Sequence, residues 1–419
     1  AVASALAESD DSLVVEAETG LGKTLAYLVP AVLSGKKVVV STNTKNLQDQ
    51  ILQSEIPFIQ KYIDPGLKAL CVKGRQNYLC LYRWNQYRAA NQQELFEDKN
   101  MERVVSWLDE TEFGERSELR WLSSGSPLWQ KICCQSHFCL GSDCPDGSAC
   151  FLNHLRREAG KSQVLVVNHH LLFSDLAVRR SGYGEVLPRY EAVIFDEAHH
   201  VEDVATTFFG YSFSRYQVTD LTGDIERSAL AELVGNKSKQ QSILTAARSV
   251  AGQIEKFFAL FPPELGRFPL DEAFQKRPEI LTHRDSLVRG FDRLAEAMEG
   301  MENRDEPWAQ YVDRANDLAA RLEAVTAERF SDLAQDEIRS VHWYERREKN
   351  MVLSSTPIDV AEDLRETLFI MVQSSLFTSA TLSTQGEFSY FLQRLGLSKQ
   401  TPALSFPSPF DYAKRSLLY

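Results

Sequence analysis

Four of the seven cysteines are spaced so that they could hold a metal centre. Cys139, Cys144 and Cys150 follow a C-x4-C-x5-C pattern, and the glycine, proline and aspartate residues between them let a loop bend around a compact centre. Zinc ribbons favour C-x2-C pairs, whereas longer spacings suit a loop that presents thiolates to separate irons. The pattern favours an iron–sulfur centre, and zinc remains an alternative.

The fourth ligand is less well defined by spacing. Cys80 is preferred because it lies in a basic and aromatic segment at the edge of the same stretch of chain. Cys133 and Cys134 are the alternatives, although adjacent thiols near a cluster are more often bystanders. Cys71 lies in an apolar strand pattern and is most simply a core residue.

Residues 17–24 predict a phosphate-binding loop between a strand and a helix. The pattern departs from G-x-x-x-x-G-K-[ST] at its first position, where Ala17 replaces glycine. Small residues let backbone N–H groups surround phosphate oxygens, Lys23 would neutralise the β- and γ-phosphates, and Thr24 would bind Mg²⁺. The alternative is a chance Gly-Lys-Thr at a strand–helix turn. The residues expected to bind ATP with Mg²⁺ are Thr19, Gly20, Leu21, Gly22, Lys23 and Thr24.

An acidic box follows a second apolar strand at residues 193–195. Ligands of open α/β sheets bind at the carboxyl ends of strands, where Asp196 would hold Mg²⁺ and Glu197 would act as general base. His199 would report the state of the γ-phosphate to a neighbouring segment. Ser379 and Thr381, in a Ser-Ala-Thr sequence after another apolar strand, are the expected coupling residues. Such a tripeptide alone is usually just a strand end.

The charge of the chain is uneven. The net charge is −12, which argues against indiscriminate nucleic-acid binding. Residues 61–90, however, carry six Lys or Arg and one Asp, interleaved with five aromatic residues. A positive track with stacking faces is how single strands are held, although an ordinary solvated helix is the alternative. Residues 91–119 carry nine acids and three bases, which is typical of a solvated helical face.

Bulk composition is that of a globular protein with several structural units. The chain has 419 residues, 43% of them hydrophobic and 25% charged. No run approaches the roughly 18 apolar residues of a membrane helix, and the N-terminal residues lack the basic region of a signal peptide. They are typical of the end of a helix that begins further upstream. Seven cysteines without such a signal indicate reducing surroundings.

Strand and helix patterns alternate along the first part of the chain. Apolar strands are expected at 13–17, 37–42, 67–72, 163–168, 191–196 and 374–381. This β–turn–α–β rhythm predicts an α/β fold with a parallel, doubly wound sheet of the RecA-like P-loop type. Two insertions interrupt it, one carrying the cysteines and one mostly helical. The expected organisation is a first motor domain in three parts at 1–73, 161–204 and 341–403, a cysteine domain at 74–160, a helical insertion at 205–340 and a linker at 404–419.

The motifs and their order resemble the XPD/DinG-type superfamily 2 iron–sulfur DNA helicases, and more closely the bacterial DinG/YoaA branch. The resemblance spans nearly the whole chain. It is carried by residues 18–24, 41–44 with 47–50, 73–80, 139–144, 167–172, 196–199, 378–382 and 408–411.

The resemblance implies a [4Fe–4S] domain with Cys80, Cys139, Cys144 and Cys150 as ligands, and an Arch domain in the helical insertion. It implies ATP-dependent 5′→3′ unwinding in DNA repair and replication, on single-stranded and forked or bubble DNA, by a cytoplasmic, bacterial and monomeric protein with repair or replication partners. Lys23, Asp196, Glu197 and His199 would be the catalytic residues. The expected DNA-binding residues are Ser41, Thr42, Asn43, Lys73, Arg75 and Tyr78. For these a structural role is the alternative: Arg75 could instead support a cysteine loop, and the imidazoles at 169–170 could pack, couple or bind DNA.

One departure from the family's pattern matters for activity. Nothing in the sequence resembles the arginine-rich motif of the family's second motor domain, so we expect a piece of a longer helicase. Such a piece would bind DNA but hydrolyse ATP and unwind duplex poorly, because the transition-state charge lacks its arginine finger. The alternatives are an ATP-gated single-strand DNA clamp without translocation, and a redox sensor whose cluster gates the motor. A nuclease, which some relatives carry in an extra N-terminal domain, is discounted.

Overall fold

The computed structural model describes residues 1–7, 11–18, 20–90, 99–123, 125–135, 139–180, 185–233, 235–299, 308–327, 340–348, 350–408 and 410. The chain forms two compact units. One contains residues 1–208 and 360–419, and the other contains residues 209–359.

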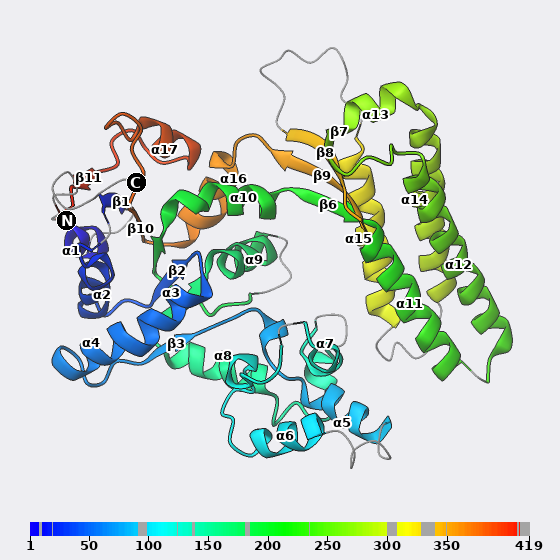
Figure 1. Cartoon of the computed structure of the whole chain (residues 1–419), viewed down its shortest axis with the longest axis horizontal. Helices are drawn as coiled ribbons and strands as arrows, with labels where there is room; N and C mark the ends of the chain where they lie inside the picture. Colours follow the sequence, from blue (N-terminus) through cyan, green and yellow to red (C-terminus); the bar gives the residue numbers. More distant parts are fainter. Residues whose placement is uncertain are drawn as a thin grey trace, which may run out of the picture. The chain divides into compact units, whose positions relative to one another are not determined.

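The first unit is built on a seven-stranded sheet in which every neighbouring pair of strands is parallel. The strand order is β11-β1-β10-β5-β2-β4-β3 (Figure 1). This confirms the predicted α/β fold with a RecA-like parallel sheet. The strands are β1 (Asp11–Ala17), β2 (Val38–Thr42), β3 (Ala69–Cys71), β4 (Val164–Asn168), β5 (Ala192–Asp196), β10 (Ser374–Ser379) and β11 (Ala403–Phe406).

Both faces of this sheet are covered, which explains why its central strands are continuous apolar runs. On one face Val38, Val166 and Ile194 pack with Leu28 of α2 in a single core. On the other face the rings of Phe195 and Phe377 stack with centroids 4.9 Å apart. The helices of this unit that accompany the sheet are α1 (Val2–Ala7), α2 (Lys23–Leu33), α3 (Lys45–Gln50), α4 (Ile56–Tyr62), α9 (His169–Arg180), α10 (Val201–Phe209), α16 (Ala361–Leu364) and α17 (Ser389–Arg394).

Strand register brings the motif residues to one edge of the sheet. Glu16 of β1 lies opposite Ser379 of β10, and Thr378 of β10 lies opposite Asp196 of β5. Because all three strands are parallel, the segments that follow their carboxyl ends meet at the same edge. The phosphate loop, the acidic box and the Ser-Ala-Thr sequence are therefore neighbours in space.

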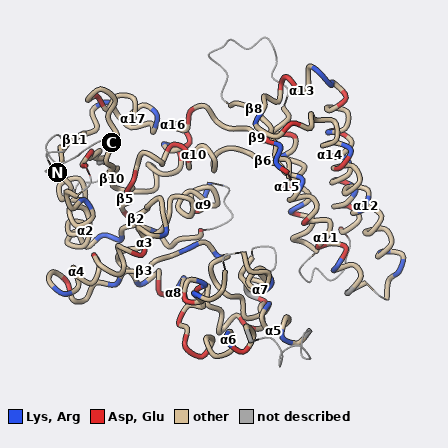
Figure 2. Tube along the Cα trace, viewed as in Figure 1, with Lys and Arg blue, Asp and Glu red and all other residues tan. Residues whose placement is uncertain are grey.

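The cysteine-bearing insertion lies between β3 and β4 and has a small core of its own. Trp84, Trp107 and Trp129 are buried there with Leu79 and Ile132. Its helices are α5 (Leu81–Ala90), α6 (Lys99–Leu108), α7 (Pro127–Ile132) and α8 (Phe151–Lys161). Figure 2 shows residues of both signs of charge along this insertion.

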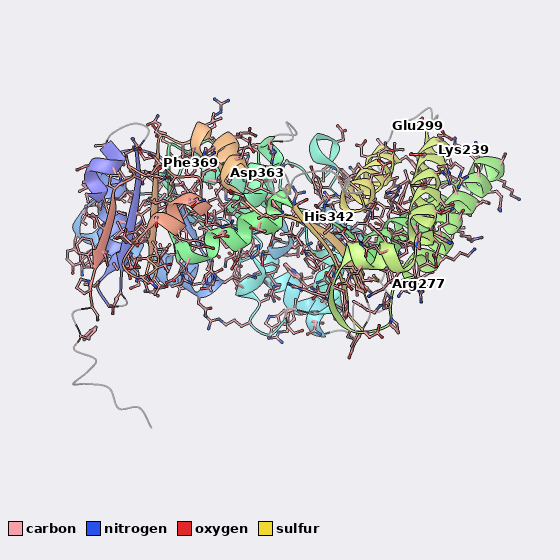
Figure 3. All side chains as sticks on the ribbon, turned by 90° about the horizontal axis from the view of Figure 1, so that it is seen from above. Lys239, Arg277, Glu299, His342, Asp363 and Phe369 are labelled. Carbon is pink, nitrogen blue, oxygen red and sulfur yellow. The ribbon has the colours of Figure 1, made fainter. Side chains whose placement is uncertain are left out.

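The second unit combines a helical core with a four-stranded antiparallel sheet of order β6-β9-β8-β7. Two hydrogen bonds link elements of this unit (Figure 3). His342 of β8 has its Nδ1 2.6 Å from the carbonyl oxygen of Val325, the last residue of α15. Lys239 of α12 donates to the carbonyl oxygen of Glu299, which follows α14, at 2.9 Å. The elements are β6 (Tyr211–Ser214), α11 (Arg215–Glu232), α12 (Lys237–Ala259), β7 (Gly266–Pro269), α13 (Leu270–Lys276), α14 (Glu279–Met298), α15 (Trp308–Val325), β8 (Ser340–Arg346) and β9 (Met351–Pro357).

Two expected boundaries differ from the structure. We expected the helical insertion to end at 340 and the motor sheet to resume at 341, but the second unit runs to Asp359, because β8 and β9 pair with each other and with β6 and β7. We also expected a linker from residue 404, but β11 pairs with β1 at the edge of the parallel sheet. The mainly α insertion that we expected thus also contains this antiparallel sheet. Among the described residues, no helix is long and apolar enough to cross a bilayer.

Candidate nucleotide site and thiol cavity

The phosphate loop turns sharply between β1 and α2. Gly20 and Gly22 have φ angles of 87° and 77°, in the left-handed region that favours glycine. A Cβ atom on Gly20 would come within 2.6 Å of the Phe410 ring, so a larger residue there would have to displace that ring. Lys23 donates from Nζ to the carbonyl oxygen of Ala17 at 2.7 Å, which folds its ammonium group back over the loop. Thr19 lies outside the described residues, whereas Leu21 is exposed and Thr24 is half-buried in the first turn of α2.

Asp196 ends β5 beside this loop and is buried. Its carboxylate accepts hydrogen bonds from Tyr27 Oη at 3.0 Å and from the backbone N–H of Glu197 at 3.0 Å. Burial raises the pKa of Asp196, and the Tyr27 hydrogen bond offsets part of this effect. Tyr27, on α2, is also buried, and burial raises its pKa well above the ordinary value, so it stays a neutral donor. A buried carboxylate at this point is suited to hold Mg²⁺ next to Lys23.

Glu197 holds an unusual backbone conformation. Its φ of 56° and ψ of 45° place a non-glycine residue in the left-handed region, where strain is concentrated at functional sites. The turn directs the following 3₁₀ segment, Ala198–His200, away from the strand direction. As a result His199 Nδ1 lies 2.6 Å from Ser379 Oγ and 3.5 Å from Glu197 Oε2. Thr381, two residues further along, is exposed.

Glu16, at the carboxyl end of β1, forms several hydrogen bonds across this edge of the sheet, and no sequence motif contains it. Its carboxylate accepts hydrogen bonds from the backbone N–H groups of Leu382 and Ser383, both at 2.7 Å, and from the hydroxyls of Ser383 and Ser405, both at 3.0 Å. Burial raises the pKa of Glu16, but these hydrogen bonds outweigh burial and leave the pKa below its ordinary value. Glu16 thereby links the phosphate-loop strand to the segments after β10 and in β11. Its only signal in the sequence is a charged residue at the end of an apolar strand.

The segment expected to grip DNA begins inside the fold. Ser41 and Thr42 are fully buried at the end of β2, and Asn43 is half-buried. Ser41 Oγ lies 2.7 Å from Nδ1 of His169, which is also fully buried. Thr42 Oγ1 donates to the carbonyl of Thr44 at 3.2 Å. Of these three predicted residues, only Asn43 has a side chain partly open to solvent.

Lys73 and Tyr78, also expected along the DNA path, are held within the protein. Lys73 Nζ pairs with Glu115 and lies 3.6 Å from Asp49 Oδ1, and its side chain is 8% exposed. Burial lowers the pKa of Lys73, but the hydrogen bond with Glu115 outweighs burial and raises it. Tyr78 is fully buried, and its Oη accepts from the backbone N–H of Lys73 at 2.9 Å. Both residues therefore have structural roles in this structure.

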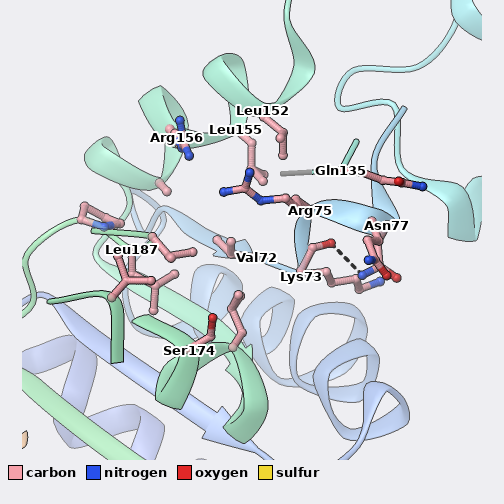
Figure 4. Close-up of a pocket in the computed structure, with 17 residues that line it drawn as sticks. Val72, Lys73, Arg75, Asn77, Gln135, Leu152, Leu155, Arg156, Ser174 and Leu187 are labelled. Carbon is pink, nitrogen blue, oxygen red and sulfur yellow. Dashed lines mark hydrogen bonds between the residues drawn. The ribbon is translucent and has the colours of Figure 1, made fainter. Parts of the chain in front are cut away.

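Arg75 is placed differently. It lines a cavity of about 470 Å³ together with Arg156 of α8 and the apolar side chains of Leu152 and Leu187 (Figure 4). In this view the guanidinium of Arg75 extends toward α8, away from the hydrogen bond that Asn77 Nδ2 donates to the carbonyl of Gly74 at 2.8 Å. Arg75 and Arg156 also line the neighbouring cavity that contains the thiols.

The predicted cysteine ligands meet at that second cavity, which has a volume of about 280 Å³. It is lined by Cys80, Cys139, Cys144 and Cys150, and also by Cys134. A hydrogen bond with Cys134, together with Arg83, lowers the pKa of Cys80 to about 6, although burial acts in the opposite sense. Cys80 and Cys150 directly precede α5 and α8, and helix N-termini favour thiolates. In the described part of the chain, no three His, Cys, Asp or Glu side chains are arranged to hold a metal ion.

The two alternative ligands, Cys133 and Cys134, differ in their position relative to the cavity. Cys133 is 1% exposed and belongs to the core around Trp84 and Trp129, and it is not among the residues that line the cavity. Cys134 lies on the cavity and donates to the carbonyl of Leu79 at 3.3 Å. Cys71 is buried in β3, where burial raises its pKa to about 12, as expected for an inert core thiol.

Comparison with known proteins agrees with this arrangement. Residues 1–88 match the family model described as DEAD/DEAH box helicase. The chain is 33% identical to the ATP-dependent DNA helicase YoaA of Haemophilus influenzae over 98% of the chain and 62% of that protein. It is 34% identical to YoaA of Escherichia coli and 32% identical to the ATP-dependent helicase DinG of Mycobacterium tuberculosis, in each case over 98% of the chain and 63% of the relative. The chain carries a DEAD/DEAH helicase domain and is homologous to the YoaA and DinG helicases.

This homology confirms the family resemblance drawn from the motifs. The chain spans slightly less than two thirds of the length of these relatives. The phosphate loop, the acidic box and the Ser-Ala-Thr sequence, which carried that resemblance, lie at the carboxyl ends of β1, β5 and β10, and β10 lies between the other two strands.

Proposed function

We propose that this chain is the ATP-binding part of a DNA helicase that couples ATP hydrolysis to 5′→3′ movement along single-stranded DNA. One observation carries the proposal: His199 of the acidic box is hydrogen-bonded to Ser379 at the same sheet edge as Lys23 and Asp196. A bound γ-phosphate that alters the conformation of the acidic box would move His199. Through the hydrogen bond with Ser379, this would also shift the segment after β10. DNA repair and replication intermediates, forked or bubble DNA, are the proposed substrates, and the proposed setting is the bacterial cytoplasm.

In this proposal each residue of the nucleotide site has a distinct role. The backbone N–H groups of residues 19–24 and the Lys23 ammonium bind the phosphates, and Thr24 and Asp196 hold Mg²⁺. Glu197 orients and deprotonates the attacking water. Tyr27 keeps Asp196 oriented through its hydrogen bond. An arginine supplied from outside this chain would stabilise the transition state, so the chain alone is expected to turn ATP over slowly.

We also propose that Cys80, Cys139, Cys144 and Cys150 would hold a [4Fe–4S] cluster in the thiol cavity. This proposal is supported by the fact that the four cysteines line one shared cavity from different segments of the insertion, since a cluster takes one thiolate at each iron. Two of them precede helix N-termini, which favour the thiolate form. When bound, such a cluster would fix the loop at 139–150 against α5. Arg75 and Arg156, beside it, are suited to contact a DNA phosphate.

Nucleotide binding and turnover test the proposal. The wild-type chain, Lys23→Ala and Glu197→Gln are compared for binding of Mg²⁺ with a fluorescent ATP analogue, and for steady-state ATP hydrolysis with and without oligo-dT. We expect binding by the wild type and Glu197→Gln, loss of binding in Lys23→Ala, and turnover only in the wild type. A wild-type chain that binds no nucleotide refutes the proposal.

The rival function is an ATP-gated, redox-sensing module that binds single strands without translocation. This function would be favoured if the chain binds oligo-dT in a salt-dependent way but DNA does not stimulate ATP hydrolysis. The test is repeated with a second polypeptide that corresponds to the part of the relatives that this chain does not cover. Strand-stimulated turnover under those conditions favours the motor. Full helicase rates from this chain alone would contradict the expected need for an external arginine.

A further inference from the structure

His169 lies beside the end of β2 and the strand that leads into the acidic box. The sheet order β5-β2-β4 places β2 between the strand that ends in Asp196 and the strand that precedes His169. Ser41 of β2 lies opposite Phe195 of β5 on one side and Val167 of β4 on the other. The imidazole therefore lies where three strand ends meet, and its ring centroid is 6.0 Å from that of Phe195.

The imidazole uses one nitrogen and leaves the other unsatisfied. Nδ1 lies 2.7 Å from Ser41 Oγ, whereas Nε2 finds no hydrogen-bond partner among the described residues. The ring is fully buried, and an unpaired polar atom in such a place is unfavourable. Burial lowers the pKa of His169 to about 3, so the ring is neutral and carries one proton.

The backbone of the acidic box is within electrostatic reach of the His169 imidazole. The backbones of Glu197 and Asp196 raise the pKa of His169 against the larger effect of burial, which places them close to the ring, and Nε2 has no hydrogen-bond partner among the described residues. Glu197 is also the residue with the strained φ of 56°. A small rotation of this turn would supply the hydrogen bond that Nε2 lacks. Since a carbonyl can only accept, the proton belongs on Nε2, and Ser41 donates to Nδ1.

We propose that His169 is a positioning residue that couples the 41–43 segment to the acidic box. A strand bound at the partly open Asn43 would shift the end of β2 and with it the buried Ser41, which moves the imidazole so that it makes or breaks a hydrogen bond with the Glu197 carbonyl. The same link runs in reverse when nucleotide reshapes the Asp196–Glu197 turn. Coupling between two ligands is reciprocal, so one residue would serve both directions. The inference rests on the proposed function, because it needs nucleotide and DNA to bind this chain.

The neighbouring His170 provides a matched control. It follows His169 in α9, is exposed, and packs its ring 5.8 Å from that of Phe208. His169→Leu removes both polar nitrogens at similar volume, His169→Asn keeps a polar group near the position of Nδ1, and Ser41→Ala removes the other partner. His170→Leu makes the same chemical change on the surface.

The measurement is the affinity for fluorescent oligo-dT, by anisotropy, with and without a non-hydrolysable ATP analogue and Mg²⁺. We expect the ratio of the two dissociation constants to differ from one by about fivefold or more in the wild type. His169→Leu should bring the ratio to about one while each affinity measured alone changes less than about threefold, and Ser41→Ala should also bring the ratio to about one. His170→Leu should keep the wild-type ratio, and His169→Asn should restore part of it.

Each outcome of this measurement either supports or overturns the inference. A wild-type ratio retained in both His169→Leu and Ser41→Ala overturns the inference, as does a wild-type ratio of one when both ligands bind. A wild-type chain that binds neither ligand refutes the proposed function first, and the inference with it. If His169→Leu does not fold, as judged by thermal unfolding, Ser41→Ala and His169→Asn still give the ratio.

Discussion

Ser379 Oγ lies 2.6 Å from Nδ1 of His199, which joins the end of β10 to the acidic box after β5. Ser379 is fully buried and His199 is partly exposed, so the hydrogen bond forms at the boundary between the sheet and the nucleotide side. Burial lowers the pKa of His199, which keeps its imidazole neutral near pH 7. A neutral ring can accept from or donate to a hydroxyl, and can therefore follow changes at the γ-phosphate without gaining charge.

The first prediction concerns this pair. His199→Ala and Ser379→Ala should each lower the free energy of unfolding, and the double variant should show a coupling energy of about 0.5–1.5 kcal/mol, typical of one hydrogen bond. Urea unfolding of the four proteins measures it. His200, whose ring lies 4.0 Å from that of His199, is the control, because His200→Ala should show no coupling with Ser379→Ala. Additive effects of His199 and Ser379 would contradict the prediction.

The second prediction concerns Glu16. Glu16→Gln should lower the free energy of unfolding at pH 7 by about 1–3 kcal/mol, because the variant has no charged acceptor for several N–H and O–H donors. The pKa of Glu16 lies below its ordinary value of 4.5, so its ionised form stabilises the fold above that pH, and this stability is lost as the pH falls through the lowered pKa. The difference between wild type and variant should therefore shrink on acidification. A difference that stays constant to pH 3 would argue against an ionised Glu16, and Ser405→Ala, which removes one donor, should have a smaller effect.

The third prediction concerns the thiol cavity. The chain purified without oxygen should contain about four irons with matching sulfide and a broad visible absorption. Cys144→Ser should lose most of the iron. Cys133→Ser should keep it and lose only stability, since the Cys133 thiol is part of the tryptophan-rich core. Stoichiometric zinc would overturn the cluster, and loss of iron in Cys134→Ser with retention in Cys80→Ser would reassign the fourth ligand.

The fourth prediction separates Lys73 from Arg75. Lys73→Met should destabilise the fold by about 3 kcal/mol, because it leaves Glu115 without its buried partner. Its affinity for oligo-dT should keep the wild-type salt dependence. Arg75→Ala should instead reduce the slope of log affinity against log salt by about 0.7 for each phosphate that the arginine no longer neutralises. Thermal unfolding and salt titrations measure the two effects, and a reduced slope in Lys73→Met with unchanged stability would reverse the assignment.

The motor sheet was predictable because its strands are contiguous apolar runs that end in recognisable motifs. Val193, Ile194 and Phe195 predict a buried strand, and Asp196 then falls at its carboxyl end without any tertiary information. The antiparallel sheet of the second unit was not predictable in this way. Its strands β6 and β7 are four residues long each, and their partners lie far along the chain, so local pattern could not assign β8 and β9 to it.

The same limit applies within the site. Lys23, Asp196 and His199 were found because short patterns contain them. Glu16 meets its donors 366 to 389 residues later, and Ser41 meets His169 128 residues later. Lys73 and Tyr78 have residue types suited to DNA contact, yet Lys73 pairs with acidic groups supplied by other parts of the chain and Tyr78 is fully buried. Such pairings depend on the fold, and a single sequence carries no direct sign of them.

The cysteine-bearing insertion leaves the sheet after β3 and returns at β4, and these two strands are direct neighbours. A parallel pair needs a crossover connection, and α8, which leads directly into β4, can provide it without the rest of the insertion. The thiol-bearing part is therefore an insertion in the connection between the two strands of an otherwise ordinary β–α–β unit. It could be excised, or exchanged for a different metal-binding domain, while the strand order of the host and its nucleotide edge remain intact.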